Sequence, residues 1–456
     1  MNEVYQKAEV LKRKPFFGNV RQILKDPVGF LGRLPADYGP VVKAGFAGKT
    51  YFILQHPDYI KHVLLDNHKG YSKPGATKLL GLFLGEGLIT SNGEVWYKKR
   101  RLMQPSFHKQ RVGYMLDIIN EETTACINKL DSLPPGAPVN ISNELLQLNI
   151  SIIGRALFST ALKEEMETMV KALDELTGYA SAWMKSIIKI PVDWPTPANR
   201  NFKNNCRVFD SIIYSIIDRR RKYRADPGMA AHDDLLDMLL DYLDQDTNDA
   251  MTEKQLRDEV TTMFMAGQET TSQTLSWIFY HVAKEKGILK KIQEETSNIL
   301  SASLPEPGDL SKLVYTRQVI QEGMRCYPAV CALVRQPYQD DEIRGIKIPV
   351  SAKVLINIYG IHHHPQYWNN PFDFDPGRFA VSPQKEHSPF VYLPFGSGPR
   401  LCIGNNFAMM IMQVVVSRVS RHFEMELLPG YVASIETNIT LRPKEGVQLL
   451  VWRRPG

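Results

Sequence analysis

A cysteine stands in a glycine-rich segment, Phe395 to Gly404, that reads Phe-Gly-Ser-Gly-Pro-Arg-Leu-Cys-Ile-Gly. Glycines on both sides let the backbone wrap closely past a bulky group. Cys402 comes just before a predicted helix that opens near Asn405, and the dipole of that helix favours a thiolate over a thiol. The segment therefore offers a thiolate ligand. The alternative is an ordinary buried cysteine after a turn, because buried free cysteine is common.

A second segment of interest runs from Ala266 to Thr271 and reads Ala-Gly-Gln-Glu-Thr-Thr. It lies midway along a long predicted helix, from Leu256 to about Lys284, that is apolar nearly all round and is expected to cross the protein's centre. A glycine inside a helix costs about 1 kcal/mol relative to alanine, so Gly267 suggests a use for the missing side chain. The alternative is an ordinary polar step in a helix, because six residues alone are a weak signal.

Two pairs of residues have helical spacing. Trp96 and Arg100 are four residues apart, after the plausible helix cap Asn92, and share one helical face. Glu322 and Arg325 are three residues apart, where a charge-assisted hydrogen bond can form. Taken alone, the second pair is a surface ion pair that contributes little stability.

Short strands are expected at three places beside the predicted helices. The first is a hairpin at 41–54, with a turn at 47–49. The second is a hairpin at 344–359 around Pro349, and the third is a strand pair at 439–452 with its turn at 444–446. The stretch 71–88 is rich in Gly, Leu and Phe without a clean period, so we expect a mobile apolar loop that faces a ligand.

The composition indicates one large globular protein. The chain has 456 residues, of which 43% are hydrophobic and 23% charged, which is enough apolar material for a core. A net charge of +6 is a mild excess that gives no evidence for nucleic-acid binding. Five cysteines without paired spacing indicate a reducing compartment. No segment has the length of apolar sequence that a membrane span needs, so we expect a soluble, cytoplasmic protein.

The pattern Phe-x-x-Gly-x-Arg-x-Cys-x-Gly from Phe395 to Gly404 resembles the haem-binding loop of the cytochrome P-450 family, the haem-thiolate monooxygenases. The resemblance implies that Cys402 is the axial iron ligand of a haem b (iron protoporphyrin IX). It also implies a mainly α fold with small β-sheets, in which the haem lies between the long central helix and the cysteine-bearing loop. We expect a single haem-containing domain over residues 1–456, without a fused reductase.

Further residues match the family in the expected order. By this resemblance, Thr270 and Glu269 are the catalytic pair that delivers protons, and Ala266 and Gly267 give room to O2 and substrate. The other expected haem-binding residues, several of them at the propionates, are Trp96, Arg100, Arg335, Phe395 and Arg400, with Lys73 as a weaker candidate. Glu322 and Arg325, joined by Arg378, are expected to form a structural lock that holds the loop before Cys402.

The function implied is a monooxygenase that inserts one oxygen atom from O2 into a C–H or C=C bond of a hydrophobic substrate. Electrons are expected from a separate ferredoxin or flavodoxin, for which Lys98, Lys99 and Arg101 form a candidate docking patch. The residues leave fatty acids, terpenoids, steroids and carotenoids open as substrates. Alternative functions are a haem-thiolate isomerase, dehydratase or peroxygenase, and a non-enzymatic haem sensor.

Other features have ordinary interpretations. Three consecutive histidines, 362–364, suggest a metal site, but in an extended segment they would point in alternate directions. The tripeptides that begin at Asn149 and Asn438 fit glycosylation acceptors, yet nothing indicates secretion. We expect no function from either feature.

Overall fold

The computed structural model describes residues 8–11, 23, 25–46, 48–74, 76–107, 112–162, 164–186, 190–230, 232, 234–243, 250–300, 304–381 and 388–454. The chain divides into two compact units. One comprises residues 1–76 and 318–403, and the other comprises residues 77–317 and 404–456. The expectation of one haem-containing domain without a fused reductase stays a prediction.

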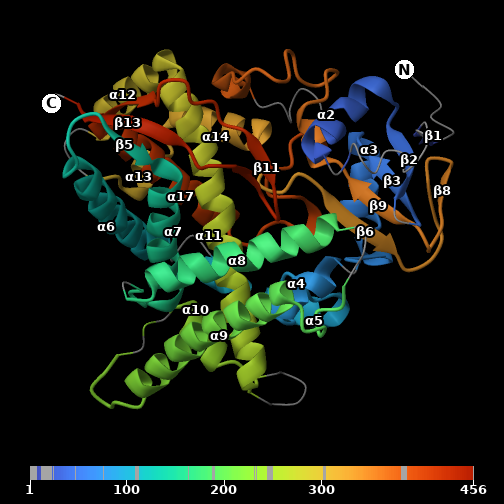
Figure 1. Ribbon diagram of the computed structural model, residues 1–456, viewed down its shortest axis with the longest axis horizontal. Helices are drawn as coiled ribbons and strands as arrows, with labels where there is room; N and C mark the ends of the chain where they lie inside the picture. Colours follow the sequence, from blue (N-terminus) through green and yellow to red (C-terminus); the bar gives the residue numbers. More distant parts are fainter. Residues whose placement is uncertain are drawn as a thin grey trace. The chain divides into compact units, whose positions relative to one another are not determined.

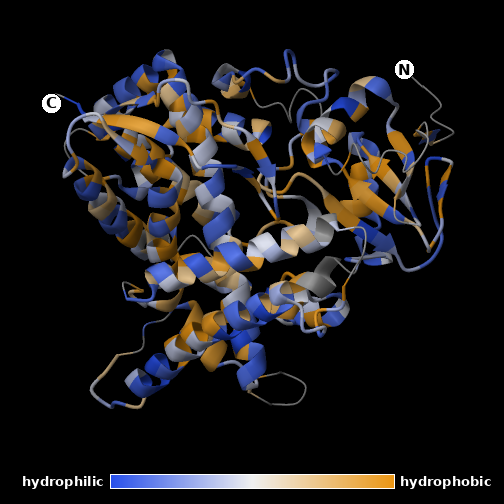
Figure 2. Ribbon diagram, viewed as in Figure 1, coloured by the Kyte–Doolittle hydropathy of each residue, from blue (hydrophilic) through white to orange (hydrophobic). Residues whose placement is uncertain are grey.

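The first unit is built on a six-stranded sheet (Figure 1). The hairpin expected at 41–54 is present, although its first turn residue, Ala47, lies outside the described residues. Hydrophobic residues dominate the central strands (Figure 2), and their buried side chains form the core of this unit. The strands, in spatial order, are β1 (Glu9–Val10), β2 (Val41–Phe46), β3 (Lys49–Leu54), β9 (Lys353–Ile356), β6 (Leu333–Pro337) and β4 (Tyr71–Ser72).

The second expected hairpin, at 344–359, is wrong in its strand pairing. The segment Ile346–Ile348 (β8) pairs with Asp341–Ile343 (β7) in a separate two-stranded sheet. The strand after the turn, β9, pairs instead with β3 and β6. The alternating pattern marks both strands correctly, but alternation carries no information about which strand is the partner.

Helices cover the rest of the first unit. His56 caps α3 by accepting a hydrogen bond from the amide of Asp58. The three histidines do not lie in an extended segment, because α15 ends at His362. The elements are α2 (Pro27–Asp37), α3 (Pro57–Lys61), a π-helical turn (His62–Asp66), α14 (Val314–Cys326, in this unit from residue 318), α15 (Ile358–His362), and 3-10 turns at His68–Gly70, Pro376–Ala380, Pro389–Val391 and Gly398–Arg400.

The second unit is mainly helical (Figure 1). Its helices are α4 (Ala76–Leu84, in this unit from residue 77), α5 (Gly93–Met103), α6 (Val112–Asp131), α7 (Ile141–Phe158), α8 (Met166–Lys185), α9 (Pro197–Arg224), α10 (Leu235–Leu240), α11 (Glu253–Lys284), α12 (Lys286–Leu300), α13 (Pro307–Leu310) and α17 (Asn405–His422), with a 3-10 turn at Gln104–Phe107. The predicted mobile loop at 71–88 is wrong, because most of it forms α4 and the short strand β4.

The long helix α11 confirms the predicted central helix and begins three residues earlier than expected. Its start is fixed by a capping box, in which Thr252 Oγ1 accepts from the amide of Gln255 and Gln255 Oε1 accepts from the amide of Thr252. Most residues between Leu256 and Ala283 are buried. A helix that is buried all round must lie inside its unit, as the sequence pattern predicts.

Two small sheets complete the second unit. Strand β13 (Gln448–Arg453) lies between β10 (Phe423–Leu427) and β5 (Ala137–Asn140). Strands β11 (Ile435–Thr437) and β12 (Leu441–Pro443) form a separate hairpin. The expected pairing within 439–452 is therefore wrong, because the predicted turn after β12 joins strands that belong to two different sheets.

Candidate functional site

The cysteine-bearing loop is closed by its own backbone. The amide of Cys402 donates to the carbonyl oxygen of Phe395 at 3.0 Å, and the amide of Leu401 donates to the carbonyl oxygen of Gly398 at 3.0 Å. Gly396 and Gly398 have φ values of 73° and 70°, a left-handed conformation that favours glycine. Helix α17 begins at Asn405, as predicted. The loop therefore holds the cysteine backbone in a fixed place just before a helix.

A glycine pair in this loop gives a matched test of the local backbone. A Cβ at Gly398 would overlap the backbone carbonyl oxygen of Leu64, whereas a Cβ at Gly396 would meet only Leu333 Cδ1, at 4.0 Å. We expect Gly398→Ala to lower the free energy of unfolding by about 2–4 kcal/mol, and Gly396→Ala by only about 1–2 kcal/mol from the left-handed backbone. Urea unfolding of both variants measures the difference. Equal losses would contradict the contact with Leu64.

Cys402 differs from the other four cysteines in exposure. It is the exposed one, whereas Cys126 and Cys326 are buried and the remaining two are half-buried. Burial raises the pKa of the Cys206 thiol to about 12 and that of Cys331 to about 11, so neither favours a thiolate. Cys402 is therefore the most exposed of the five cysteines.

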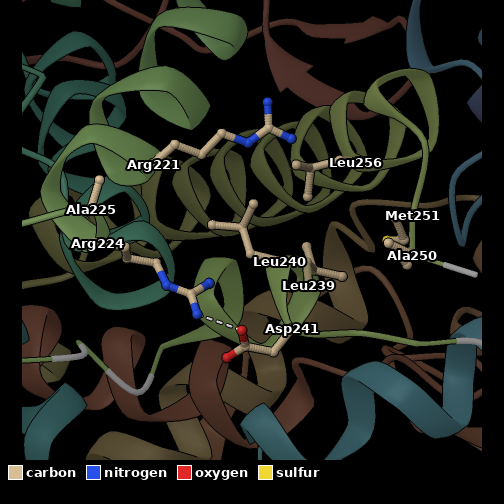
Figure 3. A pocket seen from close by; sticks show the side chains of 9 residues that line it. All are labelled: Arg221, Arg224, Ala225, Leu239, Leu240, Asp241, Ala250, Met251 and Leu256. Atoms are coloured by element: carbon tan, nitrogen blue, oxygen red, sulfur yellow. Dashed lines mark hydrogen bonds and ion pairs between the residues drawn. The ribbon is translucent and has the colours of Figure 1, made fainter.

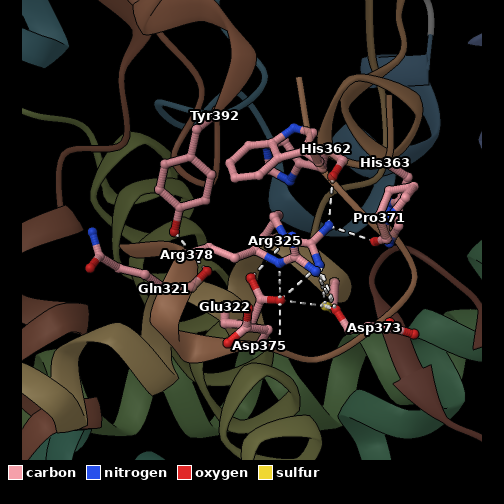
Figure 4. Close-up of polar contacts among 12 residues, drawn as sticks. Gln321, Glu322, Arg325, His362, His363, Pro371, Asp373, Asp375, Arg378 and Tyr392 are labelled. Carbon is pink, nitrogen blue, oxygen red and sulfur yellow. Dashed lines mark hydrogen bonds and ion pairs between the residues drawn. The ribbon is translucent and has the colours of Figure 1, made fainter. Parts of the chain in front are cut away.

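The predicted lock of Glu322, Arg325 and Arg378 is present in the first unit (Figure 4). Glu322 accepts two hydrogen bonds from Arg325, at 2.7 and 2.8 Å, and one from Arg378 at 3.1 Å. The side chains of Glu322 and Arg325 are fully buried. A bidentate pair of this kind combines charge with fixed geometry.

The lock also ties together the segments before the cysteine loop. Arg325 donates to the backbone carbonyls of His362, Pro371 and Asp373 at 2.7–3.0 Å (Figure 4). The Tyr392 hydroxyl donates to the carbonyl of Gln321 at 2.9 Å. The first of the three consecutive histidines takes part in this packing. His362 Nε2 accepts a hydrogen bond from the amide of Leu393, three residues before Gly396.

A cluster of cations lies in the first unit. The pairing of β4 with β6 places Ser72 opposite Gln336, which brings Lys73 next to Arg335. Burial, Arg400 and Arg335 together lower the pKa of Lys73 to about 7. Burial and Arg400 also lower the pKa of Arg335 to about 10. Arg335 is buried, whereas Lys73 and Arg400 are half-buried. Like charges held close together and partly shielded from water favour a negatively charged ligand.

Helix α11 has a half-exposed stripe in its middle. Ala266, Gly267, Thr270 and Gln273 are half-buried, whereas the residues between them are buried. Ala266, Thr270 and Gln273 have the spacing of one helical face. The Thr270 hydroxyl donates to the carbonyl oxygen of Ala266 at 2.8 Å. Of the predicted residues, Ala266 and Thr270 therefore lie together on this face, whereas Glu269 is buried and Gly267 faces Ile153 of α7.

Gly267 allows close packing of α7. A Cβ at this position would approach Ile153 Cδ1 at 2.7 Å. The fully buried Asn149 also donates from its side chain to the carbonyls of Gly267 and Gln268, at 3.0 and 2.7 Å. Sequence reasoning missed Asn149, because its tripeptide suggests only glycosylation. A buried amide that binds two helix carbonyls has no signature in the sequence.

Helix α5 presents Trp96 and Arg100 one turn apart, with Trp96 buried and Arg100 half-buried. Asn92 occupies the cap position, as predicted. The candidate docking patch on this helix needs a correction. Lys98 and Arg101 are exposed, but Lys99 forms an ion pair with the fully buried carboxylate of Glu259 at 2.7 Å. Lys99 therefore belongs to the interior.

The segment 85–90 is fixed to α11 by the carboxylates of Glu259 and its neighbour Asp258. Asp258 accepts from the amide of Glu86 at 2.9 Å, and Glu259 accepts from the amide of Leu88 at 3.0 Å. Lys99 donates to the carbonyl oxygen of Glu86. A Cβ at Gly85 or Gly87 would overlap side chains of α11. These contacts fix the backbone that leads into α5.

A cavity of about 450 Å³ lies between α9, α10 and the first turn of α11 (Figure 3). Its arginines have acidic partners, since Arg224 binds Asp241 and Arg221 binds Glu253. Leu256 is ten residues before Ala266, about 15 Å along a helix. The cavity is therefore separate from the stripe on α11.

Two searches of the described part of the chain gave negative results. No cluster of His, Cys, Asp and Glu side chains with the arrangement of a metal site occurs among these residues. No helix among them is both long enough and apolar enough to span a bilayer.

Comparison with known proteins gives the family. The family model of cytochrome P450 matches residues 9–451. The chain is 31% identical over 450 residues to putative cytochrome P450 132 of Mycobacterium bovis, covering 93% of this chain and 92% of the relative. It is 29% identical over 419 residues to cyclooctat-9-en-7-ol 5-monooxygenase of Streptomyces melanosporofaciens, covering 91% and 89%. It is also 29% identical over 441 residues to protein LUTEIN DEFICIENT 5, chloroplastic, of Arabidopsis thaliana, covering 91% and 72%. With its mainly helical fold and small sheets, the chain belongs to the cytochrome P450 family and is a haem-dependent monooxygenase.

Proposed function

We propose that the chain binds haem b with the Cys402 sulfur as the axial iron ligand. The observation that carries this proposal is the exposure of Cys402, alone among the five cysteines, on a loop closed by its own backbone. A thiolate ligand donates electron density to iron and favours cleavage of the O–O bond. When bound, the haem activates O2, and one oxygen atom is transferred to a C–H or C=C bond of the substrate while the other leaves as water.

The donor set of the chain fits the two propionates of haem b. Buried Arg335 and half-buried Lys73 and Arg400 form a group of like charges that a dianion would stabilise. Arg100, with Trp96 one turn before it on α5, supplies a further guanidinium and an indole N–H. We assign these five residues to propionate binding, and Phe395 to packing against the porphyrin.

Proton supply is assigned to the acid and the alcohol on α11. Glu269 is 8% exposed, and burial raises the pKa of its carboxyl. An acid with a raised pKa still carries its proton closer to neutral pH, which is the requirement for a general acid. We propose that Glu269 brings protons inward and that the Thr270 hydroxyl hands them to oxygen. Ala266, on the half-exposed stripe, is proposed to leave room for O2 and substrate. The role expected for Gly267 needs a correction, because its missing side chain makes room for Ile153 of α7 instead.

The substrate is proposed to be a hydrophobic molecule, and the electron donor a ferredoxin or flavodoxin. The residues 332–334 and Ala266 are apolar and half-buried, as suits an apolar ligand. A relative named as a monooxygenase of cyclooctat-9-en-7-ol supports this substrate class. Exposed Lys98 and Arg101 can attract an acidic donor. The five cysteines form no disulfide, which supports a reducing, cytoplasmic location.

A spectroscopic and an activity measurement test the function. The purified protein with haem, reduced under carbon monoxide, is expected to give the red-shifted Soret band of sulfur ligation. With a surrogate ferredoxin, its reductase and O2, a lipid library should yield products that carry one added oxygen atom. A reduced carbon monoxide adduct without the red shift would contradict ligation by Cys402. Products formed with peroxide but not with O2 and reductant would favour a peroxygenase.

A further inference from the structure

Glu269 has a partner on a segment that is remote in the sequence. The hydroxyl of Thr440 donates to Glu269 Oε1 at 2.8 Å. Thr440 is 2% exposed and lies in the turn between β11 and β12. In the sequence it is the last residue of a tripeptide that suggests glycosylation. The structure places its hydroxyl instead on the carboxyl group of the proposed proton donor.

The turn that carries Thr440 is attached to two helices of the same unit. The indole N–H of Trp277, on α11, donates to the carbonyl oxygen of Leu441 at 3.2 Å. The Ser181 hydroxyl, on α8, donates to the carbonyl oxygen of Thr437 at 3.4 Å. Hydrogen bonds on either side of Thr440 therefore hold its hydroxyl within hydrogen-bonding distance of the Glu269 carboxyl group.

Charged groups around Glu269 come from three elements. Arg442, on β12, binds Glu436 of β11 at 2.6 Å and Asp174 of α8 at 2.8 Å. The Asp174 side chain is largely exposed, so this group of ions reaches solvent. Burial raises the pKa of Glu269, the Thr440 hydrogen bond and Arg442 lower it, and Asp174 raises it. Among the interactions that lower the pKa of Glu269, the hydrogen bond from Thr440 thus has the largest effect.

We propose that Thr440 is a positioning residue for Glu269, which fixes the orientation of the carboxyl group and decides which of its oxygens carries the proton. The proposal rests on the function proposed for Glu269. Because Oε1 already accepts the Thr440 hydrogen, the acid proton resides on Oε2. That proton leaves from Oε2, and a proton from solvent then restores the acid, so the net charge is unchanged.

Removal of the Thr440 hydroxyl has two expected effects. In Thr440→Val the carboxylate loses a hydrogen bond that stabilises its charged form, so the pKa of Glu269 rises. The carboxyl group is also free to rotate, and the fraction of electrons recovered in oxygenated product is expected to fall about 3–10-fold, with hydrogen peroxide released instead. Thr440→Ser keeps the hydroxyl and should restore both properties.

Infrared spectroscopy gives a readout that does not depend on turnover. The C=O stretching band of the protonated Glu269 carboxyl is identified by its loss in Glu269→Gln. In Thr440→Val this band should titrate at higher pH than in the parent protein and shift in frequency. The control is Thr437→Val, a change of the same kind three residues away on the hairpin, which should leave the band unchanged. Spectral titration with one substrate checks that binding is retained.

Two outcomes separate this inference from the proposed function. If Thr440→Val leaves the Glu269 band and the product yield per electron unchanged, while Glu269→Gln alters that yield, Thr440 does not position the acid. If Glu269→Gln leaves the yield and its pH dependence unchanged, the assignment of Glu269 as proton donor fails, and this inference fails with it.

Discussion

Replacing Cys402 with alanine is expected to reduce turnover with O2 and reductant by at least about a thousandfold, because in the proposed function the Cys402 thiolate promotes O–O cleavage. Carbon has no lone pair to give to iron, so any haem retained by the variant would be held without sulfur ligation. The reduced carbon monoxide adduct of Cys402→Ala should therefore lack the red-shifted Soret band. Product formation by mass spectrometry and the spectrum of the adduct measure the two effects.

The matched control for this variant is Cys206→Ala, on α9. Burial raises the pKa of the Cys206 thiol to about 12, so this side chain is a protonated thiol at neutral pH. We expect the Cys206 variant to keep both the red-shifted band and the turnover of the parent protein. Should Cys402→Ala retain the band while the control loses it, the axial ligand would have to be reassigned.

A second large effect is expected on stability. Replacing Glu322 with glutamine should lower the free energy of unfolding by about 3–5 kcal/mol, because the positive charges of Arg325 and Arg378 would remain without their buried carboxylate. The side chains of Glu322 and Arg325 are fully buried, and that of Arg378 is 10% exposed, so water cannot replace the lost charge. Denaturant unfolding of the parent and variant measures the difference.

A surface pair provides the comparison for the Glu322 variant. Glu294 and Lys290 are 3.9 Å apart on α12 and their side chains are largely exposed. Glu294→Gln is the same chemical change and is expected to cost less than about 0.5 kcal/mol. If both substitutions destabilise the protein by a similar small amount, the three-residue lock does not hold the fold together.

Local signals explain what the sequence predicts well. The glycines around Cys402 act on their own stretch of backbone, so the loop and the start of α17 fall where expected. Helix α11 is also predicted from its local pattern, although it begins three residues before the predicted start. The spacing of Glu322 and Arg325 predicts their contact, but their burial and their link to Arg378 are expected only from the family resemblance. Motifs of this kind predict the family and the main elements of the site.

Contacts between distant segments are harder to predict. The strand alternation at 346–348 and 353–356 is correct, yet the two strands have different partners. Thr440 reaches Glu269 only because the hairpin is anchored to α11, and its local sequence suggests glycosylation instead. In the sequence, nothing distinguishes Lys99 from its exposed neighbour Lys98. Only the ion pair of Lys99 with the buried Glu259 shows that its side chain points into the protein.

The burial of Lys99 has a practical consequence for kinetic work on electron transfer. Dissolved ions screen charges that face water, with a Debye length of about 8 Å at physiological ionic strength, but they reach an interior ion pair poorly. Lys98 and Arg101 are open to such screening, whereas Lys99 is bound to a fully enclosed carboxylate. The salt dependence of reduction by an acidic protein would therefore report on the exposed cations of α5. The ion pair between Lys99 and Glu259, which attaches α5 to α11, would persist as the salt concentration rises.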